Sequence, residues 1–223
     1  MQVRKRDGTL EDLNIDKLHK VVMYACEGIA GVSASQVEIN SKIQFFDKID
    51  TEDIQETLIK SAADLISEEA PNYQYVAGRL INYHLRKMVY GQFEPPCLCD
   101  IVQENIDAGF YDPEFTDLYT KDEINQLQSY IDHERDEVLT YAAMEQFRGK
   151  YLVQNRATGQ IYETPQVAYM MIAATLFAKY PEDTRMSYIK AYYDAISLFK
   201  ISLPTPVMAG VRTPQRQFSS CVL

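Results

Sequence analysis

Two short segments of the sequence carry the side chains best suited to chemistry. Lys5 and Arg6 are adjacent cations. Their ammonium and planar guanidinium groups can pair with a ligand that carries several negative charges, such as a triphosphate with about four. Further along, Phe218-Ser-Ser-Cys221 puts a thiol on an apolar, strand-like stretch. Each segment also has a plainer interpretation, because cations often protect an edge strand and a cysteine often packs as a small hydrophobic side chain.

A hairpin and four helices must position the two cations. Val3 to Leu13 alternates in character around Asp7-Gly8, a dipeptide that favours a tight turn because both positions tolerate positive φ. Apolar residues at helical spacing, followed by Gly28, predict the first helix and its end. We expect helices over residues 17–26, 35–45, 51–66 and 71–90.

The rest of the sequence predicts a second, mainly helical domain. The segment from Gly91 to Pro96 interrupts helix geometry twice and is the best domain boundary in the chain. Thr120-Lys-Asp-Glu123 fits a capping box that opens an acidic helix. Further along we expect helices over residues 138–147, 165–180 and 185–199, and a short hairpin over 151–162.

Composition excludes several classes of protein. With 46% hydrophobic and 24% charged residues, the chain is typical of a packed globular protein of one or two domains. Four cysteines, without an apolar signal segment or a long apolar run, predict a reducing cytoplasm and no membrane span. The net charge of −10 is concentrated in residues 94–137, which hold 13 acidic residues. That surface disfavours nucleic-acid binding and is either a solvated helical face or a docking surface for a basic partner.

The sequence predicts no metal site. Cys97-Leu-Cys99 has no second Cys or His pair at a suitable interval, so it offers at most two ligands, too few for structural zinc. His19, His84 and His133 fall on three different predicted helices with no carboxylate pattern joining them. We assign these histidines to packing or surface roles.

Two motifs together carry a family resemblance. Ile201-Ser-Leu-Pro-Thr-Pro-Val-Met-Ala-Gly-Val-Arg212 followed by Phe218-Ser-Ser-Cys221 resembles the first barrel strands of the large catalytic subunit of class I ribonucleotide reductases. The resemblance covers residues 3–223, but only the first part of such a subunit. It implies that the chain is inactive alone. We therefore expect a split large subunit, whose barrel a second polypeptide completes, with a truncated product as the alternative.

The resemblance assigns roles in ribonucleoside-diphosphate reduction. It makes Cys221 one half of a redox-active pair that gives two electrons by forming a disulfide, and it places Thr205 and Ser220 at the substrate diphosphate. It implies as partners a small radical-generating subunit, which holds the radical cofactor, and thioredoxin or glutaredoxin as reductant.

The first 90 residues, a hairpin followed by four helices, resemble the ATP-cone, a regulatory nucleotide-binding domain of many ribonucleotide reductases. Its diagnostic stretch is Val3-Arg-Lys-Arg-Asp-Gly8. The resemblance implies an ATP or dATP effector, held by the following residues: Val3, Lys5, Arg6, Glu11, Asn14, Lys17, Thr51, Gln55 and Lys87. Gln55 stands where bacterial members usually have a His beside the sugar, and Tyr24 replaces a Trp.

The expected fold class is therefore mainly α with small β elements. We expect an ATP-cone over residues 1–92, a helical domain over 93–200, and the first strands of an incomplete α/β barrel over 201–223. Two alternatives from other classes are a free-standing ATP-cone nucleotide sensor without catalysis and a helical assembly domain without a ligand. The sensor would need paired Cys-x-x-Cys motifs and a basic face for DNA, and the assembly domain leaves Lys5, Arg6 and Lys87 unexplained as a group.

Overall fold

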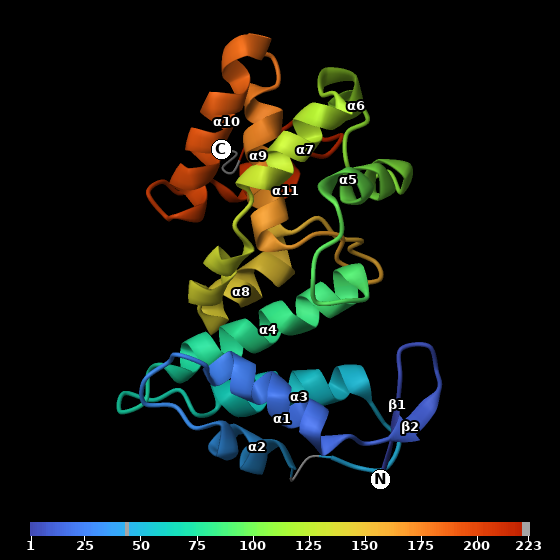
Figure 1. Cartoon of the computed structure of the whole chain (residues 1–223), viewed down its shortest axis with the longest axis vertical. Coiled ribbons are helices and arrows are strands. Elements are labelled where there is room, and N and C mark those ends of the chain that lie inside the picture. Colours follow the sequence, from blue (N-terminus) through green and yellow to red (C-terminus); the bar gives the residue numbers. More distant parts are fainter. Residues whose placement is uncertain (43–44, 220–223) are drawn as a thin grey trace. The chain divides into compact units, whose positions relative to one another are not determined.

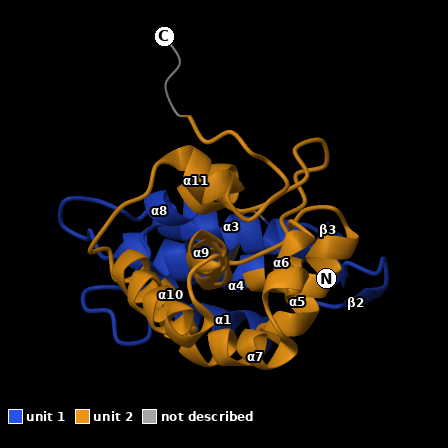
Figure 2. Cartoon of the chain, turned by 90° about the horizontal axis from the view of Figure 1, so that it is seen from above, with its two compact units in different colours: residues 1–85, 137–145 blue, residues 86–136, 146–223 orange. Residues whose placement is uncertain are grey.

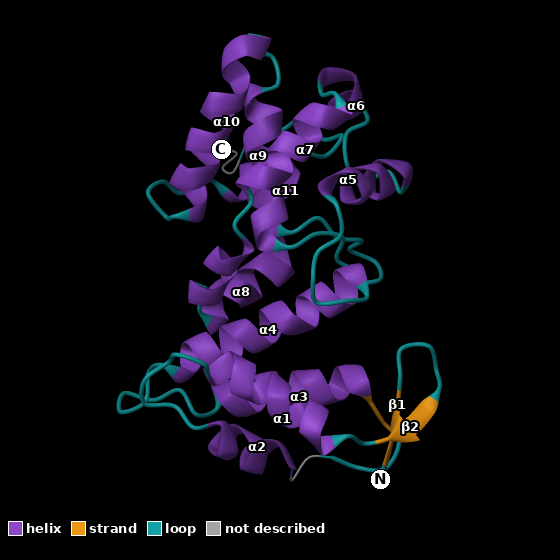
Figure 3. Cartoon of the chain, in the orientation of Figure 1, coloured by secondary structure: helices purple, strands orange, loops and turns teal. Residues whose placement is uncertain are grey.

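The computed structural model describes residues 1–42 and 45–219, and it divides into two compact units (Figures 1 and 2). Unit 1 holds residues 1–85 and 137–145, and unit 2 holds residues 86–136 and 146–223. Helices dominate both units, and strands occur at one place only in the described part of the chain (Figure 3). The expected mainly α fold with small β elements is confirmed.

A three-stranded sheet of order β2-β1-β3 opens unit 1. The hairpin of β1 (Gln2–Arg4) and β2 (Leu10–Asp12) is the predicted one, with Val3 opposite Glu11. Gly8 has a φ of +84° at its turn, which glycine adopts at little cost. The third strand, β3 (Ile49–Asp50), is parallel to β1 and was not foreseen.

Four helices pack behind this sheet within unit 1. They are α1 (Ile15–Cys26), α2 (Ala34–Lys42), α3 (Thr51–Ala63) and α4 (Tyr73–Tyr90), of which the residues up to Leu85 belong to the unit. The predicted helices are thus all present. Their shared core includes five side chains that are fully buried: Val22, Val37, Leu58, Val76 and Leu80.

The segment of residues 137–145 belongs to unit 1 because it packs closely on α4. A Cβ atom added to Gly78 would lie 2.1 Å from the backbone oxygen of Leu139, so only glycine permits this approach. Arg79 adds a hydrogen bond from its Nε to the carbonyl oxygen of Glu137 at 3.3 Å. A segment distant in sequence therefore completes the unit of the first four helices.

Unit 2 is built from short helices around one buried helix. In chain order these are α5 (Leu98–Asp107), α6 (Glu114–Leu118), α7 (Lys121–Tyr130), a 3-10 helix η1 (His133–Val138), whose last two residues belong to unit 1, a π-helical turn η2 (Phe147–Tyr151), α9 (Pro165–Phe177), α10 (Glu182–Ser197) and α11 (Thr205–Gly210). Helix α8 (Tyr141–Gln146), which lies between η1 and η2 in the sequence, belongs to unit 1 except for Gln146. The predicted capping box at Thr120 and Glu123 is present at the start of α7.

Helix α9 forms the core of unit 2. All ten residues from Pro165 to Ala174 are buried, as the nearly unbroken apolar sequence predicts. Figure 2 shows α9 end on, with α10, α7, α5 and α11 around it. Of the hairpin expected over residues 151–162, only one antiparallel bridge between Gln154 and Ile161 forms.

The expected strands over residues 201–223 are not found in the described part, residues 201–219. That segment contains the short helix α11 and irregular chain. Pro206 suits the first turn of a helix, where its missing N–H has no intrahelical partner to lose. A strand also needs a neighbouring strand for its backbone groups, and the described residues supply none at this place. The barrel-strand prediction is therefore wrong for residues 201–219.

Among the residues that the structure describes, no helix is both long and apolar enough to cross a membrane.

Candidate functional site

The first candidate site is the turn of the β1–β2 hairpin and its two cations. The Lys5 amide donates to the Thr9 carbonyl at 2.8 Å, and the Gly8 amide donates to the Lys5 carbonyl at 2.9 Å. Asp7 Oδ1 accepts from the Thr9 amide at 2.9 Å, which locks the turn. Both cations lie beside carboxylates: Lys5 Nζ is 2.7 Å from Glu11 Oε1, and Arg6 Nε is 2.9 Å from Glu52 Oε1.

Strand β3 brings the start of α3 to the same place. Strand β3 runs parallel to β1, with Arg4 opposite Asp50, and α3 begins at the next residue, Thr51. The Arg6 Nε atom donates to Glu52 Oε1 at 2.9 Å, which joins the second cation to the first turn of α3. The positive end of the helix dipole of α3 is therefore adjacent to both cations, an arrangement that favours anions.

The start of α1 adds two predicted site residues. Asn14 caps the helix, with its Oδ1 accepting from the Lys17 amide at 3.0 Å. The Lys5 hydrogen bond, with a smaller contribution from the charge of Lys17, holds the pKa of Glu11 below its usual value. Glu11, Asn14 and Lys17 therefore lie next to the hairpin cations. Val3 is a buried residue of β1 that fixes the strand between β2 and β3.

Gln55 lies one helical turn after Thr51 on α3. Its Oε1 atom is buried and accepts no hydrogen bond from any residue that the structure describes. A buried acceptor without a donor costs about 1–3 kcal/mol, so a ligand hydroxyl or amine that reached it would be favoured. This orphaned oxygen fits a nucleotide whose sugar or base lies along α3 while its phosphates lie at the hairpin.

The structure adds Tyr83, which the sequence reasoning missed. Burial raises the pKa of the Tyr83 phenol, and the charge of the nearby Arg6 opposes that shift. The Tyr24 and Tyr83 rings lie 6.4 Å apart, so two aromatic rings accompany the cations. The available signal was the spacing on α4, where Tyr83 precedes the predicted ligand Lys87 by one helical turn.

One predicted nucleotide ligand lies outside unit 1. Lys87 belongs to the last turn of α4, within unit 2, so its relation to the hairpin is not fixed. Tyr24, which stands at the family's Trp position, donates from its hydroxyl to Glu137 Oε1 at 3.4 Å. Eight of the nine predicted nucleotide ligands therefore belong to the unit that contains the hairpin.

The second candidate site is only partly described. Thr205 is the first residue of α11 and is exposed. Ser220 and Cys221, the other two predicted residues of this site, lie outside the described residues.

A fully buried ion pair holds the segment around α11 in place. Arg212 Nε donates to Glu163 Oε2 at 2.8 Å, a second Arg212 nitrogen pairs with Glu163 Oε1, and both side chains are completely shielded from solvent. The pair is saturated by hydrogen bonds, because Tyr111 donates to Glu163 Oε2 at 2.6 Å and Arg212 donates to the Met208 carbonyl at 2.6 Å. Sequence patterns gave no signal for this pair.

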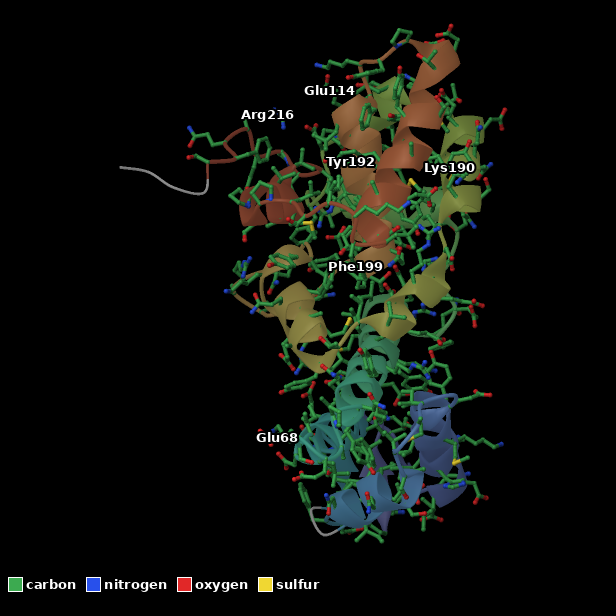
Figure 4. All side chains as sticks on the ribbon, turned by 90° about the vertical axis from the view of Figure 1, so that its left-hand side faces the viewer. Glu68, Glu114, Lys190, Tyr192, Phe199 and Arg216 are labelled. Carbon is green, nitrogen blue, oxygen red and sulfur yellow. The ribbon has the colours of Figure 1, made fainter. Side chains whose placement is uncertain are left out.

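A second, exposed ion pair follows it. Arg216, labelled in Figure 4 on the segment after α11, donates from Nη2 to Asp112 Oδ2 at 2.6 Å. The Asp112 amide also donates to the Arg212 carbonyl at 3.0 Å. The chain from Thr205 to Arg216 is thus attached to the rest of unit 2 through one buried and one exposed charge pair.

The histidines and the possible metal ligands of the described residues form no further candidate site. Within residues 1–42 and 45–219, no group of three or more His, Cys, Asp or Glu side chains could hold a metal ion. His19 contacts Glu38 at 2.6 Å on the surface, and His84 is buried with its Nε2 3.6 Å from Glu56 Oε1. Burial lowers the pKa of His133 to about 4.

Two families of known domains match parts of the chain. Residues 1–88 match the ATP cone domain family, and residues 137–216 match the family described as the ribonucleotide reductase all-alpha domain. The first match contains the hairpin, α1 and α3, and the second contains α9, α10 and α11.

The chain is also similar over its whole length to curated proteins. It is 58% identical to ribonucleoside-diphosphate reductase 1 subunit alpha of Escherichia coli K12, over 99% of this chain and 29% of that protein. It is 56% identical to the ribonucleoside-diphosphate reductase subunit alpha of Haemophilus influenzae, over 100% of this chain and 30% of that protein. It is 46% identical to the subunit alpha of Enterobacteria phage T4, over 100% of this chain and 29% of that protein. The chain thus spans about three tenths of the length of these relatives.

The chain therefore matches an ATP cone domain family and a ribonucleotide reductase all-alpha domain family, and it is similar to a part of the ribonucleoside-diphosphate reductase alpha subunits.

Proposed function

We propose that unit 1 binds ATP or dATP as an allosteric effector, with its phosphates at Lys5, Arg6 and the start of α3. The observation that carries this proposal is the pairing of β1 with β3, which brings two adjacent cations to the N-terminus of a helix. Lys5 and Arg6 would exchange their carboxylate partners for phosphate oxygens. Asn14, Lys17 and Gln55 would then contact the base and sugar.

Calorimetric titration of the chain with ATP tests this proposal. We expect one binding isotherm in the micromolar range, because charge-assisted hydrogen bonds from two cations and a helix N-terminus all meet the phosphates. Millimolar ATP should also raise the temperature of unfolding. A folded chain that shows neither heat nor a thermal shift up to millimolar ATP would contradict the proposal.

We further propose that the chain contributes to ribonucleoside-diphosphate reduction. The names and extent of the similar proteins support this activity, as does the all-alpha family match. In that reaction the 2′-hydroxyl leaves as water, and two thiols supply the electrons by forming a disulfide. Cys221 would be one of those thiols, and Thr205 and Ser220 would contact the substrate diphosphate.

The proposed catalysis depends on groups that the described residues do not supply. A radical-generating small subunit would start the reaction, a thioredoxin or glutaredoxin would restore the thiols, and the rest of the large subunit would complete the barrel. A reducing cytoplasm would suit this thiol chemistry.

With these partners present, Cys221→Ser should stop repeated turnover while ATP binding to unit 1 remains, and unchanged turnover would refute the redox role.

Gln55 is expected to set the preference between ATP and dATP. Its orphaned Oε1 can accept a hydrogen bond from the ribose 2′-hydroxyl, which dATP lacks. We predict that Gln55→His shifts the ratio of the two dissociation constants towards dATP by about two- to tenfold, the value of one hydrogen bond. Calorimetry with both nucleotides measures the ratio. Gln103→His, on α5 of unit 2, is the control, and an unchanged ratio in Gln55→His would refute this role.

A further inference from the structure

Each hairpin cation of unit 1 is held by a carboxylate of the chain itself. Lys5 Nζ lies 2.7 Å from Glu11 Oε1, and Arg6 Nε lies 2.9 Å from Glu52 Oε1. The two carboxylates come from different elements. Glu11 belongs to β2 of the same hairpin, whereas Glu52 belongs to α3 and is 46 positions from Arg6 in the sequence. Arg6 therefore contacts an anionic side chain at the place where the proposed effector would put a phosphate.

The position of Glu52 on α3 resembles that of a bound anion. Glu52 is the second residue of the helix, in the first turn, where the helix dipole favours negative charge. The N-cap residue Asp50 pairs with Arg4 Nη1 at 3.5 Å instead of capping the helix with its side chain. The Glu52 carboxylate thus has two features of a phosphate site, a helix N-terminus and a charge-assisted hydrogen bond from a guanidinium.

The ion pair of Arg6 and Glu52 can open without unfolding the unit. The side chain of Glu52 is 54% exposed and that of Arg6 is 35% exposed. Exposed ion pairs contribute little to stability, because water and salt screen the charges. The Glu52 carboxylate can therefore turn into solvent while α3 stays in place. If it stayed on Arg6, it would repel the phosphates of an incoming nucleotide, so binding has to displace it.

We propose that Glu52 is an intramolecular competitor of the effector phosphates, which holds Arg6 in the absence of nucleotide and weakens nucleotide binding. This inference rests on the proposed effector site at Lys5 and Arg6. Every bound nucleotide must break a charge-assisted hydrogen bond within the chain, so the site responds only at higher nucleotide concentrations than its cations alone would require. Because the Glu52 carboxylate acts on the phosphates, it affects ATP and dATP equally, unlike Gln55.

Calorimetric titration of the Glu52→Gln chain with ATP, dATP and inorganic tripolyphosphate tests the proposal. The amide keeps the length of the side chain but removes the charge that holds Arg6. We expect all three ligands to bind about three- to thirtyfold more tightly than to the wild-type chain, with the ratio of the ATP and dATP dissociation constants unchanged. Equal or weaker ATP binding by the folded variant would overturn this proposal, while ATP binding by the wild-type chain would still support the effector site. Failure of both chains to bind ATP would overturn both proposals.

Asp53→Asn is the matched control, because Asp53 is an exposed acidic residue of the same helical turn. It changes the net charge by as much as Glu52→Gln does, but it leaves the pair of Arg6 and Glu52 in place. We expect Asp53→Asn to change ATP affinity by less than about twofold, since solvent screens exposed charges. Circular dichroism and thermal unfolding check that both variants are folded. Equal tightening in the two variants would show that net charge limits ATP binding, and would overturn the role of Glu52.

Discussion

Replacing Arg212 with methionine should lower the free energy of unfolding of unit 2 by about 3–5 kcal/mol. The substitution leaves the Glu163 carboxylate fully buried with no cation, and an unpaired buried charge is among the costliest defects in a protein. It also removes the donors to the carbonyls of Met208 and Tyr151, which attach α11 to η2. Urea denaturation followed by circular dichroism measures the loss.

Two variants make the Arg212 result specific. Arg216→Met removes the exposed partner of Asp112 and should cost no more than about 1 kcal/mol, as surface ion pairs do. Arg212→Met combined with Glu163→Leu removes both charges and should recover much of the loss, because no buried charge remains. Similar losses for Arg212→Met and Arg216→Met would show that burial does not decide the effect.

The double variant Lys5→Ala, Arg6→Ala should weaken ATP binding by about 2–5 kcal/mol. Each substitution removes a charge-assisted hydrogen bond to phosphate, and the partners Glu11 and Glu52 are left uncompensated beside the nucleotide. The corresponding rise in the dissociation constant is from about thirtyfold to several thousandfold. Calorimetric titration with ATP measures it, and circular dichroism checks that the helices remain.

A matched control separates local contacts from net charge. Lys179→Ala removes an exposed cation of unit 2 that pairs with Glu114 at 3.4 Å, and it should leave ATP affinity unchanged. Raising the salt concentration should weaken ATP binding to the wild-type chain more than to the double variant, because fewer charges remain to be screened. Equal ATP affinity of the double variant and the wild-type chain would show that the hairpin does not bind the phosphates.

Local sequence signals predicted the parts of the fold that depend on neighbouring residues. Asp7-Gly8 forms the hairpin turn, Thr120 and Glu123 form the capping box, and the apolar run of α9 is buried. Each of these features is decided within a few residues, where turn geometry, capping and hydrophobic periodicity act.

Features that depend on distant pairing could not be predicted in the same way. Strand β3 has two residues, too short for an alternating pattern, and it exists because β1 offers an unpaired edge. The pairing of Glu163 with Arg212 joins residues 49 positions apart and has no periodic signal. Residues 205–210 form a helix where strands were expected, because strands need partners that local sequence cannot reveal.

The candidate nucleotide site was likewise predictable from the sequence only in part. The residue types and the family resemblance named Lys5, Arg6 and Thr51, but only the parallel pairing of β1 with β3 explains why they lie together. No local pattern indicated the orphaned Gln55 oxygen or Tyr83 beside Arg6, because both depend on how α3 and α4 pack.

The central claim is that the hairpin and the starts of α1 and α3 hold the nucleotide. Hydrogen–deuterium exchange of the chain with and without saturating ATP tests it most directly, because it reports where backbone amides become protected. We predict slower exchange in residues 3–17 and 51–55, with no change in α9 at the core of unit 2. Protection confined to residues 201–219, or none at all under saturating ATP, would contradict the claim.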